Sequence, residues 1–260
     1  MIHPSTIIED GAVIGAGCRI GPFCHIGAEV RLGAGVRLHS HVAITGDTVI
    51  GDETEIWPFA SVGSQPQDLK FAGEKTQLRI GARNKIREGV SINPGTTGGG
   101  GLTSIGDDCL FMLGTHVGHD CRVGNGVVVA NHASLAGHVE VGDGAIIGGL
   151  AGIHQFVRIG EGAIIGALSM VVADVIPFGS VMGERPRLAG LNLIGLKRRG
   201  LSREEISALR AGYKALFEGQ GTLRQRADAM LESADNAQVR QILDFVLSDS
   251  DRSFCTPKAK

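Results

Sequence analysis

The sequence predicts a mainly β fold, a parallel β-helix followed by a small α-helical C-terminal domain. Three observations support it: a large apolar residue recurs every sixth residue, a glycine often follows it, and the period disappears near the C-terminus. Neither an amphipathic helix nor an alternating strand needs a strict period of six. A hexapeptide repeat does, because each repeat of a parallel β-helix buries its apolar residue only against neighbouring repeats. The two runs, shifted by one residue, are Ile8, Ile14, Ile20, Ile26, Leu32, Leu38, Ile44, Ile50, Ile56, Val62, Ile80, Ile86 and Ile92, and then Ile105, Phe111, Val117, Val123, Val129, Leu135, Val141, Ile147, Ile153, Ile159, Ile165 and Val171.

Three hexapeptides complete one coil of a three-sided prism. Adjacent coils lie about 4.7–4.9 Å apart, as neighbouring strands do, so residues 18 apart in the sequence stack in space. The prism is expected to occupy residues 1–176, with a polar insertion at 64–78 and a glycine-rich insertion at 94–102. Extended loops on a rigid scaffold are more often functional than idle.

The hexapeptide period stops at Pro177, and residues 177–260 are expected to form an irregular connector and the helical domain. Ser202 and Glu205 have the pattern of a capping box that opens a helix. Helices at this end would cover an open sheet edge. The tail from about Asp249 is expected to be disordered. The three predicted helices run from Ser202 to about Phe217, from Thr222 onward, and through Val239, Ile242, Leu243 and Val246.

Composition and charge argue against several classes of function. A formal net charge of -2 at pH 7 gives no sign of a nucleic-acid binder or a bulk membrane-surface binder. No stretch approaches the roughly 18 apolar residues of a membrane span, and no signal peptide is recognisable at the N-terminus. The sequence therefore predicts a cytoplasmic protein. Scattered cysteines without CxxC spacing argue against a disulfide framework or a zinc site: Cys18, Cys24, Cys109, Cys121 and Cys255.

Reactive side chains are densest in the segment THVGHD, residues 115–120. His116 and His119 flank the inward-pointing Val117, and Asp120 follows His119. A neutral imidazole can take a proton from a hydroxyl near pH 7, and a carboxylate beside it can fix the tautomer and stabilise the imidazolium. This segment is therefore the candidate catalytic centre.

The coil period adds a second prediction. His119, Gly137 and Gln155 are each separated by 18 residues, so they are expected to stack in one column over three consecutive coils. His138 and His154 flank this column. A histidine, an unobstructed glycine amide and a carboxamide in one line suit a general base beside a donor site for an oxyanion. A single histidine outside the prism is usually structural, but four around one column favour a functional site.

A basic cluster closes the connector at Lys197, Arg198 and Arg199. These side chains either meet phosphates or an acidic protein, or form a solvated charge run, and composition leaves both interpretations open. The four glycines at 98–101 are not a phosphate-binding loop, because no lysine and helix follow them.

Together these motifs resemble the acyl carrier protein-dependent UDP-N-acetylglucosamine O-acyltransferases, the family that opens lipid A biosynthesis. The resemblance covers essentially the whole chain. Hexapeptides alone indicate only the wider acyltransferase superfamily, whereas the combination of motifs at these separations is much narrower. The motifs are QDLK (67–70), GTTGGGGLT (95–103), HVGHD (116–120), LAGHV (135–139), IHQF (153–156) and GLKRRG (195–200).

The resemblance implies a left-handed β-helix that forms a homotrimer, with active sites in clefts between subunits. It implies transfer of an (R)-3-hydroxyacyl group from acyl carrier protein to the glucosamine 3-hydroxyl of UDP-N-acetylglucosamine. No metal or other cofactor is implied, since the thioester supplies the driving force. By residue matching, His119 is the general base, Asp120 orients it, and the Gly137 amide is the oxyanion donor. The implied substrate-binding residues are Asp68, Lys70, His116, His138, His154 and Gln155 in the sugar, phosphate and acyl-pantetheine cleft, and Asn192, Arg198 and Arg199 at the nucleotide.

Three positions depart from the family pattern. Ile194 stands where relatives often carry a glutamate that contacts the nucleotide. Asn93-Pro94 replaces a common His-Arg pair at the loop entrance, so that site is not carried over. Ala167 occupies a position where glycine leaves the acyl groove long, and a methyl group there is expected to shorten the preferred acyl chain.

Four alternatives remain. The acceptor could be a 3-amino sugar nucleotide. A sister N-acyltransferase of the same pathway usually carries an extra N-terminal domain, whereas hexapeptides here begin at Ile8. A γ-type carbonic anhydrase needs three imidazoles around zinc and lacks the helical C-terminal domain. A non-catalytic scaffold trimer is the fourth.

Overall fold

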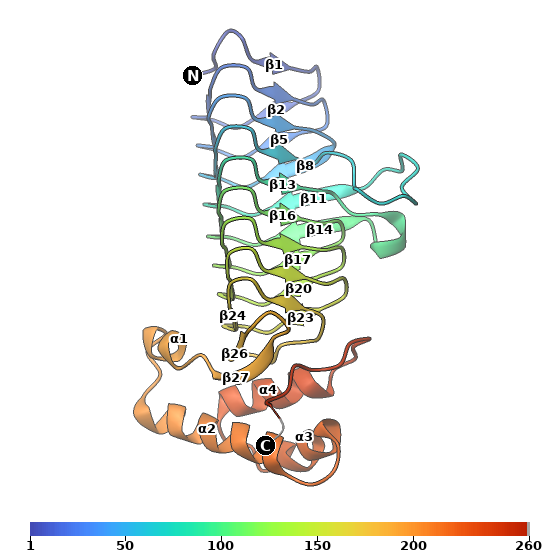
Figure 1. Ribbon diagram of the computed structural model, residues 1–260. Coiled ribbons are helices and arrows are strands. Elements are labelled where there is room, and N and C mark those ends of the chain that lie inside the picture. The colour runs from blue at the N-terminus through green and yellow to red at the C-terminus, as the bar shows by residue number, and fades with distance from the viewer. Residues whose placement is uncertain (259–260) are drawn as a thin grey trace.

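The computed structural model describes residues 1–258 and forms a tall three-sided prism with helices at its C-terminal end (Figure 1). Within these residues, three sheets make the faces of the prism. Sheet 1 contains β1 (Ile7–Ile8), β4 (His25–Ile26), β7 (Ala43–Ile44), β10 (Ser61–Val62), β13 (Ser91–Ile92), β16 (His116–Val117), β19 (Ser134–Leu135), β22 (Gly152–Ile153) and β25 (Met170–Val171). Sheet 2 contains β2 (Val13–Ile14), β5 (Arg31–Leu32), β8 (Asp47–Ile50), β11 (Gln77–Ile80), β14 (Leu102–Ile105), β17 (Arg122–Val123), β20 (Glu140–Val141) and β23 (Arg158–Ile159). Sheet 3 contains β3 (Arg19–Ile20), β6 (Arg37–Leu38), β9 (Glu55–Ile56), β12 (Lys85–Ile86), β15 (Leu110–Phe111), β18 (Val128–Val129), β21 (Ile146–Ile147), β24 (Ile164–Ile165), β26 (Gly179–Met182) and β27 (Arg187–Leu191).

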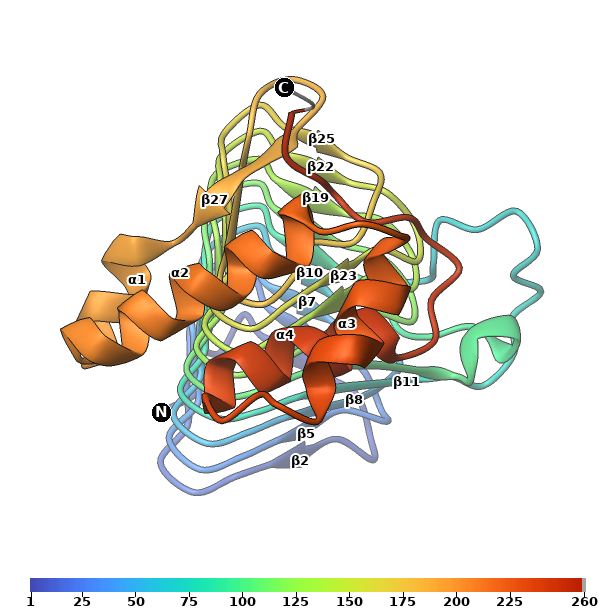
Figure 2. The same cartoon turned by 90° about the horizontal axis from the view of Figure 1, so that it is seen from below.

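The chain winds as a left-handed helix. Figure 2 looks along the prism from the C-terminal end, and the chain passes from sheet 1 to sheet 2 to sheet 3 clockwise while it approaches the viewer. Successive strands of each sheet pair in parallel from coil to coil, and among residues 1–258 only β27 pairs antiparallel, with β26. The predicted fold class, a left-handed parallel β-helix with a small helical C-terminal part, is confirmed.

The apolar residue of each hexapeptide points into the prism and forms its core. Ile26, Ile86, Phe111 and Ile147 are all fully buried. Burying a side chain of this size contributes about 1.5–3 kcal/mol, and the columns of such residues hold successive coils together.

Corner residues adopt an unusual backbone conformation that turns the chain between sheets. Asp120, His138 and Phe156 have φ angles of 59°, 62° and 62°, in the left-handed region. They are spaced 18 residues apart and therefore occupy the same corner, between sheet 1 and sheet 2. We call this the 1–2 corner, and name the 2–3 and 3–1 corners in the same way.

Both insertions leave the prism at the 1–2 corner (Figure 1). The first occupies residues 63–76, between β10 and β11. The second occupies residues 93–101, between β13 and β14, and contains the 3₁₀ helix η1 (Thr97–Gly99). The predicted insertions at 64–78 and 94–102 overlap the starts of β11 and β14, because the inner residues of these strands continue the core.

The prediction of an irregular connector after Pro177 is wrong for residues 179–191, which form β26 and β27. Strand β26 continues sheet 3 by pairing in parallel with β24, and β27 returns antiparallel to it. Val181 and Leu188 are buried, so these strands extend the core beyond the last regular hexapeptide. The division of the chain into domains at residue 176 remains a prediction.

Four helices follow within the described residues: α1 (Leu193–Arg198), α2 (Arg203–Glu218), α3 (Leu223–Leu231) and α4 (Ala237–Leu247). The capping box of Ser202 and Glu205 is confirmed, and Thr222 with Gln225 forms a second one at α3. The helices lie across the C-terminal end of the prism (Figures 1 and 2). None of the helices between residues 1 and 258 has the length and apolar character needed to cross a membrane.

The expected disorder of the tail is wrong for the residues that the structure describes. The fully buried Asp174 accepts a hydrogen bond from Ser250 Oγ at 2.7 Å, and its backbone bonds to Ser253 and Cys255. Cys255 is buried against the last coil. A buried carboxylate needs such partners: Arg158 of β23 supplies an ion pair at 2.7 Å, and the tail adds the hydrogen bond of Ser250.

Replacing Ile147 with alanine should destabilise the protein by about 2–5 kcal/mol, because it leaves a cavity in a fully buried column. Urea unfolding followed by circular dichroism measures the change. The matched control is Val13→Ala on the outer face of β2, where the side chain is 52% exposed and the expected change is below about 1 kcal/mol. Equal losses for the two variants would contradict the described core.

Candidate active site

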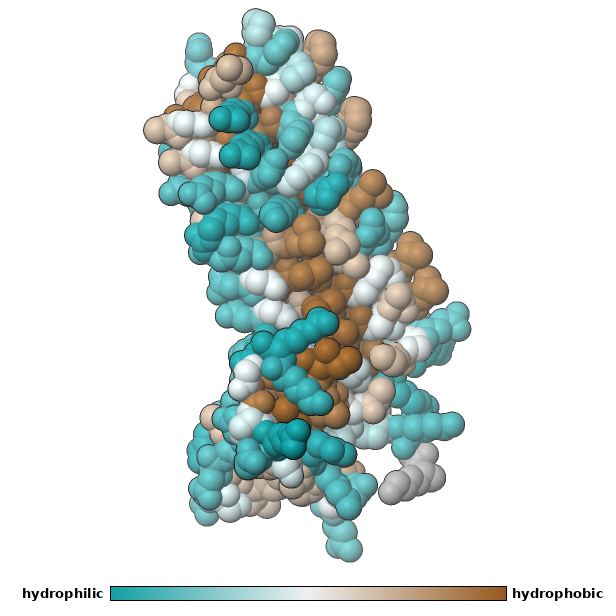
Figure 3. All heavy atoms as spheres, turned by 90° about the vertical axis from the view of Figure 1, so that its left-hand side faces the viewer, coloured by the Kyte–Doolittle hydropathy of each residue, from teal (hydrophilic) through white to brown (hydrophobic). Residues whose placement is uncertain are grey.

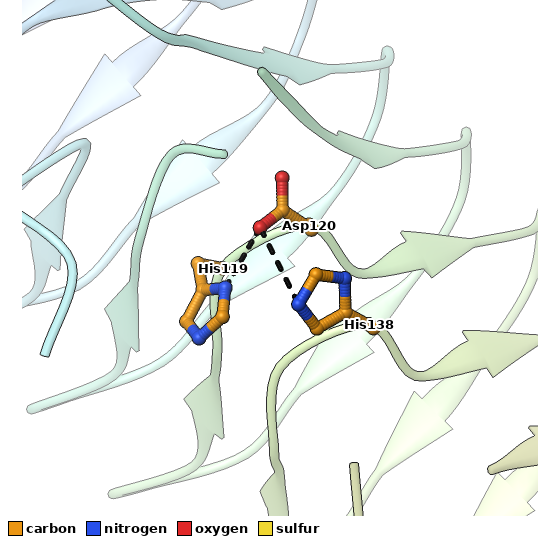
Figure 4. Close-up of side chains that lie close together, drawn as sticks. All are labelled: His119, Asp120 and His138. Carbon is orange, nitrogen blue, oxygen red and sulfur yellow. Dashed lines mark hydrogen bonds and ion pairs between the residues drawn. The ribbon is translucent and has the colours of Figure 1, made fainter. Parts of the chain in front are cut away.

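His119 and Asp120 form a hydrogen-bonded pair at the 1–2 corner (Figure 4). His119 Nδ1 lies 2.7 Å from Asp120 Oδ2. The carboxylate can only accept, so Nδ1 carries the proton and Nε2 is left with a free lone pair. The His119 side chain is 12% exposed, whereas that of Asp120 is 1% exposed. The imidazole is therefore oriented from behind and open to solvent in front, as a general base requires.

The glycine-rich insertion holds Asp120. The backbone N–H of Thr96 donates to Oδ1 at 2.8 Å, and its hydroxyl donates to Oδ2 at 2.6 Å. The Asp120 N–H in turn donates to Thr103 Oγ1 at 2.7 Å. A Cβ atom on Gly99 would lie only 2.0 Å from Asp120 Cγ, so a side chain there would displace the carboxylate. The run of glycines lets this loop close over a buried acid.

The predicted column of His119, Gly137 and Gln155 is present, and all three residues line one groove. His138 N–H donates to His119 O, and Phe156 N–H donates to Gly137 O, so the coils stack in the expected register. A Cβ atom on Gly137 would lie 2.5 Å from His119 Nε2. The imidazole therefore covers the Gly137 Cα, and glycine is required there. The Gly137 N–H makes no hydrogen bond to any atom of residues 1–258, so it is available as a donor.

A second imidazole, that of His138, lies beside the pair (Figure 4). Its Nε2 is 3.9 Å from Asp120 Oδ2, and its ring meets the His119 ring edge-on with centroids 5.0 Å apart. Phe156 stacks on His138 with centroids 4.3 Å apart and 7° between the planes. Burial lowers the pKa of His138, although the carboxylates of Asp120 and Asp68 act against this shift. His138 is therefore kept neutral near pH 7.

A groove of about 480 Å³ lies in front of His119, on the outer face of sheet 1. His116 reaches it from β16, and its Nδ1 is 2.8 Å from Ser91 Oγ. Burial lowers the pKa of His116, and the neighbouring His119 lowers it further. The groove is lined by Gln67, Asn93, His116, Gly118, His119, Ser134, Ala136, Gly137, Gly152, Ile153, His154, Gln155 and Met170.

Most of the predicted site residues on the prism converge on this groove. His116, His119, Gly137, His154 and Gln155 line it directly. The first insertion brings further predicted residues to this corner: the charge of Asp68 acts on the His138 ring, and the backbone N–H of Lys70 donates to Asp68 Oδ1 at 3.1 Å. Neither Asp68 nor Lys70 is among the residues that line the groove. Ala167 does not line the groove either: it is exposed at the 3–1 corner.

The three residues predicted at the nucleotide lie at a different corner of the same chain. Asn192 caps α1 by accepting from Gly195 N–H at 2.9 Å, and it donates to Gly162 O at the 2–3 corner. Arg199 forms an ion pair with Glu161 at 2.5 Å. Arg198 is exposed. One chain does not bring them to His119.

Sequence reasoning missed several groove residues that the coil period could have found. Ser134, Gly152 and Met170 follow the predicted His116 at steps of 18 residues and stack on the outer face of sheet 1. Gln67 and Asn93 come from the two insertions, whose lengths carry no such signal. Asn93 is 4% exposed, and its Nδ2 donates to Ser64 O at 2.9 Å.

The donor set around His119 does not suit a γ-type carbonic anhydrase. Two imidazoles and one carboxylate, those of His119, His138 and Asp120, lie within 4.8 Å of one another. The carboxylate already accepts from His119 and Thr96. Three imidazoles are needed for that zinc site. The other two imidazoles of the groove have other partners, since His116 Nδ1 is hydrogen-bonded to Ser91 and His154 Nδ1 to Arg252.

Comparisons with known proteins agree with this geometry. Residues 174–255 match the family described as UDP N-acetylglucosamine O-acyltransferase, domain 2. A curated relative from Paracoccus denitrificans, named acyl-[acyl-carrier-protein]--UDP-N-acetylglucosamine O-acyltransferase, is 60% identical over 202 residues, 78% of this chain and 77% of the relative. A relative of the same name from Rhizobium etli is 50% identical over 257 residues, 98% of this chain and 94% of the relative.

Solved structures show the same likeness. A crystal structure of a UDP-N-acetylglucosamine acyltransferase superposes with a TM-score of 0.96 at 44% identity, and the match covers 100% of both chains. The UDP-N-acetylglucosamine acyltransferase from Campylobacter jejuni superposes with a TM-score of 0.93 at 38% identity, covering 99% of this chain and 100% of that one. The chain belongs to the acyl-[acyl-carrier-protein]--UDP-N-acetylglucosamine O-acyltransferase family.

Proposed function

We propose that this protein transfers an (R)-3-hydroxyacyl group from acyl carrier protein to the 3-hydroxyl of UDP-N-acetylglucosamine, the first step of lipid A biosynthesis. The observation that carries the proposal is the free Nε2 of His119 beside the unbonded N–H of Gly137, at the edge of a groove. Acyl transfer needs these two elements, a base for the attacking hydroxyl and a donor for the oxyanion.

The first step begins at His119 Nε2, which takes the proton of the sugar 3-hydroxyl while the hydroxyl oxygen attacks the thioester carbonyl carbon. Asp120 accepts from Nδ1–H and stabilises the imidazolium that forms. Because Asp120 is buried and held by Thr96, it does not need to reorganise during the reaction.

The second step depends on Gly137. The carbonyl oxygen becomes an oxyanion in the tetrahedral intermediate, and the Gly137 N–H donates to it. When the intermediate collapses, the C–S bond breaks and the pantetheine sulfur takes the proton from the His119 imidazolium. The products are the acylated sugar and a free thiol, so the cycle needs no oxidant and no cofactor.

The remaining predicted residues are assigned to substrate binding. His116, His154 and Gln155 line the groove, and His138 stands behind it. The proposed set for the sugar, phosphate and acyl-pantetheine is Asp68, Lys70, His116, His138, His154 and Gln155, and for the nucleotide it is Asn192, Arg198 and Arg199.

A homotrimer is part of this proposal. His119 lies at the 1–2 corner, whereas Arg198 ends α1, whose cap Asn192 bonds the 2–3 corner, so a neighbouring copy is needed to bring such a nucleotide-binding segment to the groove. We propose three copies around one axis, as the family resemblance implies, since a repeated head-to-tail contact can close into such a ring.

An apolar strip on sheet 3 supports assembly. Figure 3 looks at the side where β24 and β26 lie in Figure 1 and shows the strip in the C-terminal half of the prism. Leu110, Val128, Ile146 and Ile164 stack in register there with their side chains outward. A contiguous apolar strip rimmed by polar residues is typical of an interface.

Acyl carrier protein and UDP-N-acetylglucosamine are the proposed partners, and the cytoplasm is the proposed location. The five cysteines are all free and buried, which suits a reducing compartment.

Replacing His119 with alanine should lower turnover by at least about 10²–10⁴-fold, because the attacking hydroxyl loses its base. The measurement is transfer from a 3-hydroxyacyl carrier protein thioester to UDP-N-acetylglucosamine. The control is His25→Ala. It removes a partly exposed imidazole of β4 that pairs with Glu9, and it should leave turnover unchanged. Near-normal turnover of the His119 variant would remove it from the mechanism.

Replacing Ala167 with glycine should shift the preference toward longer acyl chains, because a methyl group is removed from the proposed end of the acyl groove. Mass analysis of products from a ladder of thioesters reports the preference. The control is Ala16→Gly, because Ala16 is exposed and also follows a glycine at a corner, but in an N-terminal coil. An unchanged profile would mean that the acyl groove ends elsewhere.

The mass in solution should be three times 27.1 kDa. Introducing a charge with Ile146→Lys, in the middle of the apolar strip, should weaken assembly and lower activity together. Val13→Lys on sheet 2 is the control and should change neither. Sedimentation equilibrium measures the mass, and a fully active monomer would contradict the trimer.

A further inference from the structure

The C-terminal tail passes beside the proposed substrate groove. Phe254, Cys255 and Thr256 line a cavity of about 430 Å³, and this cavity shares Met170 with the groove. The tail is fixed in place, because Leu188 N–H donates to Thr256 O and the Asp174 backbone pairs with Ser253 and Cys255. A side chain from this tail can therefore have a defined position at the groove.

Arg252 makes such a contact. Its Nη2 lies 3.0 Å from His154 Nδ1, although the two residues are 98 positions apart in the sequence. The Arg252 backbone N–H donates to Ser250 Oγ at 3.1 Å, and Ser250 is itself held by Asp174. The Arg252 backbone is thus tied to the last coil of the prism, which places the guanidinium beside His154.

The contact selects one form of the His154 ring. A guanidinium has only donors, so Nδ1 must accept and cannot carry a proton. The carbonyl oxygen of Gln155 lies 3.3 Å from the same nitrogen and would favour the opposite tautomer. The shorter contact comes from the charged donor, which makes the stronger hydrogen bond. The ring proton is then on Nε2.

We propose that Arg252 is a positioning residue: by donating to His154 Nδ1 it fixes the His154 ring as an Nε2–H donor for the anionic diphosphate of the sugar nucleotide. This inference rests on the proposed function. Among the groove-lining residues that the structure describes, none carries a carboxylate, so a bound diphosphate meets donors and the nearby guanidinium charge. The role of Arg252 is to orient His154.

Replacing Arg252 with methionine keeps the aliphatic stem and removes the donor. The KM for UDP-N-acetylglucosamine should rise roughly fivefold, as expected for one lost hydrogen bond at a half-exposed site, with kcat within about twofold. Arg252→Lys should restore part of the loss, since an ammonium group also only donates. The matched control, Arg240→Met, removes an arginine that bonds Ala234 O in the helical region and should change neither constant.

A double-mutant cycle separates positioning from a general effect on the tail. In a His154→Ala background, Arg252→Met should raise the KM by less than about twofold further, because its partner is already absent. Independent effects that multiply would overturn the proposal. A rise in KM for the acyl carrier protein thioester, with the sugar nucleotide KM unchanged, would also overturn it.

Nuclear magnetic resonance gives a readout that needs no turnover. With ¹⁵N-labelled histidine, His154 of the wild-type protein should show the Nε2–H tautomer. The Arg252→Met variant should show a mixture of the two tautomers. The Arg252→Lys variant should show the wild-type tautomer. An unchanged tautomer in Arg252→Met would refute the proposal. Wild-type turnover in the kinetic assay tests the proposed function separately, so the two failures are distinguishable.

Discussion

The structure depends on one constraint, the hydrogen-bonded stacking of each strand on the strand of the next coil. Because of this stacking, residues one coil apart in the sequence form columns. The inner columns are apolar, and one outer column lines the groove beside His119. The insertions lengthen two coils without breaking the ladder: Val62 still pairs with Ile92, and Ile92 with Val117. Because both insertions leave from the 1–2 corner, they can form the surroundings of His119 while the column beneath it stays in register.

Much of the fold was predictable because its rules are local or periodic. The inner residues follow a period of six, and the stacking of His119 over Gly137 follows from counting one coil along the chain. The helices were predictable for a different reason, since the Ser202–Glu205 capping box is a short-range hydrogen-bonding pattern that needs no tertiary information. The left-handed sense of winding came only from the family resemblance, because a period has no hand.

The parts that could not be predicted join segments whose separation follows no period. Thr96 contacts Asp120 from an insertion whose length follows no period. Arg252 contacts His154 from the C-terminal tail, 98 positions further along the chain. The tail has few apolar residues and resembles a disordered segment, yet the buried Asp174 provides polar contacts that order it. Asn192 is a different case: the resemblance predicts it at the nucleotide, whereas the structure shows it as the cap of α1 in its own chain.

The left-handed corner has a consequence for how this protein can vary. Asp120, His138 and Phe156 each hold a conformation that costs a residue with a side chain about 1–2 kcal/mol relative to glycine. Glycine at these α-carbons would relax the backbone and delete the acid, the second imidazole or the ring that covers it. Contacts of these side chains offset part of this cost, since Asp120 accepts from Thr96 and His119, and Phe156 stacks on His138. A glycine at this corner therefore exchanges backbone strain for lost contacts, which makes these positions different from corners whose side chains touch nothing.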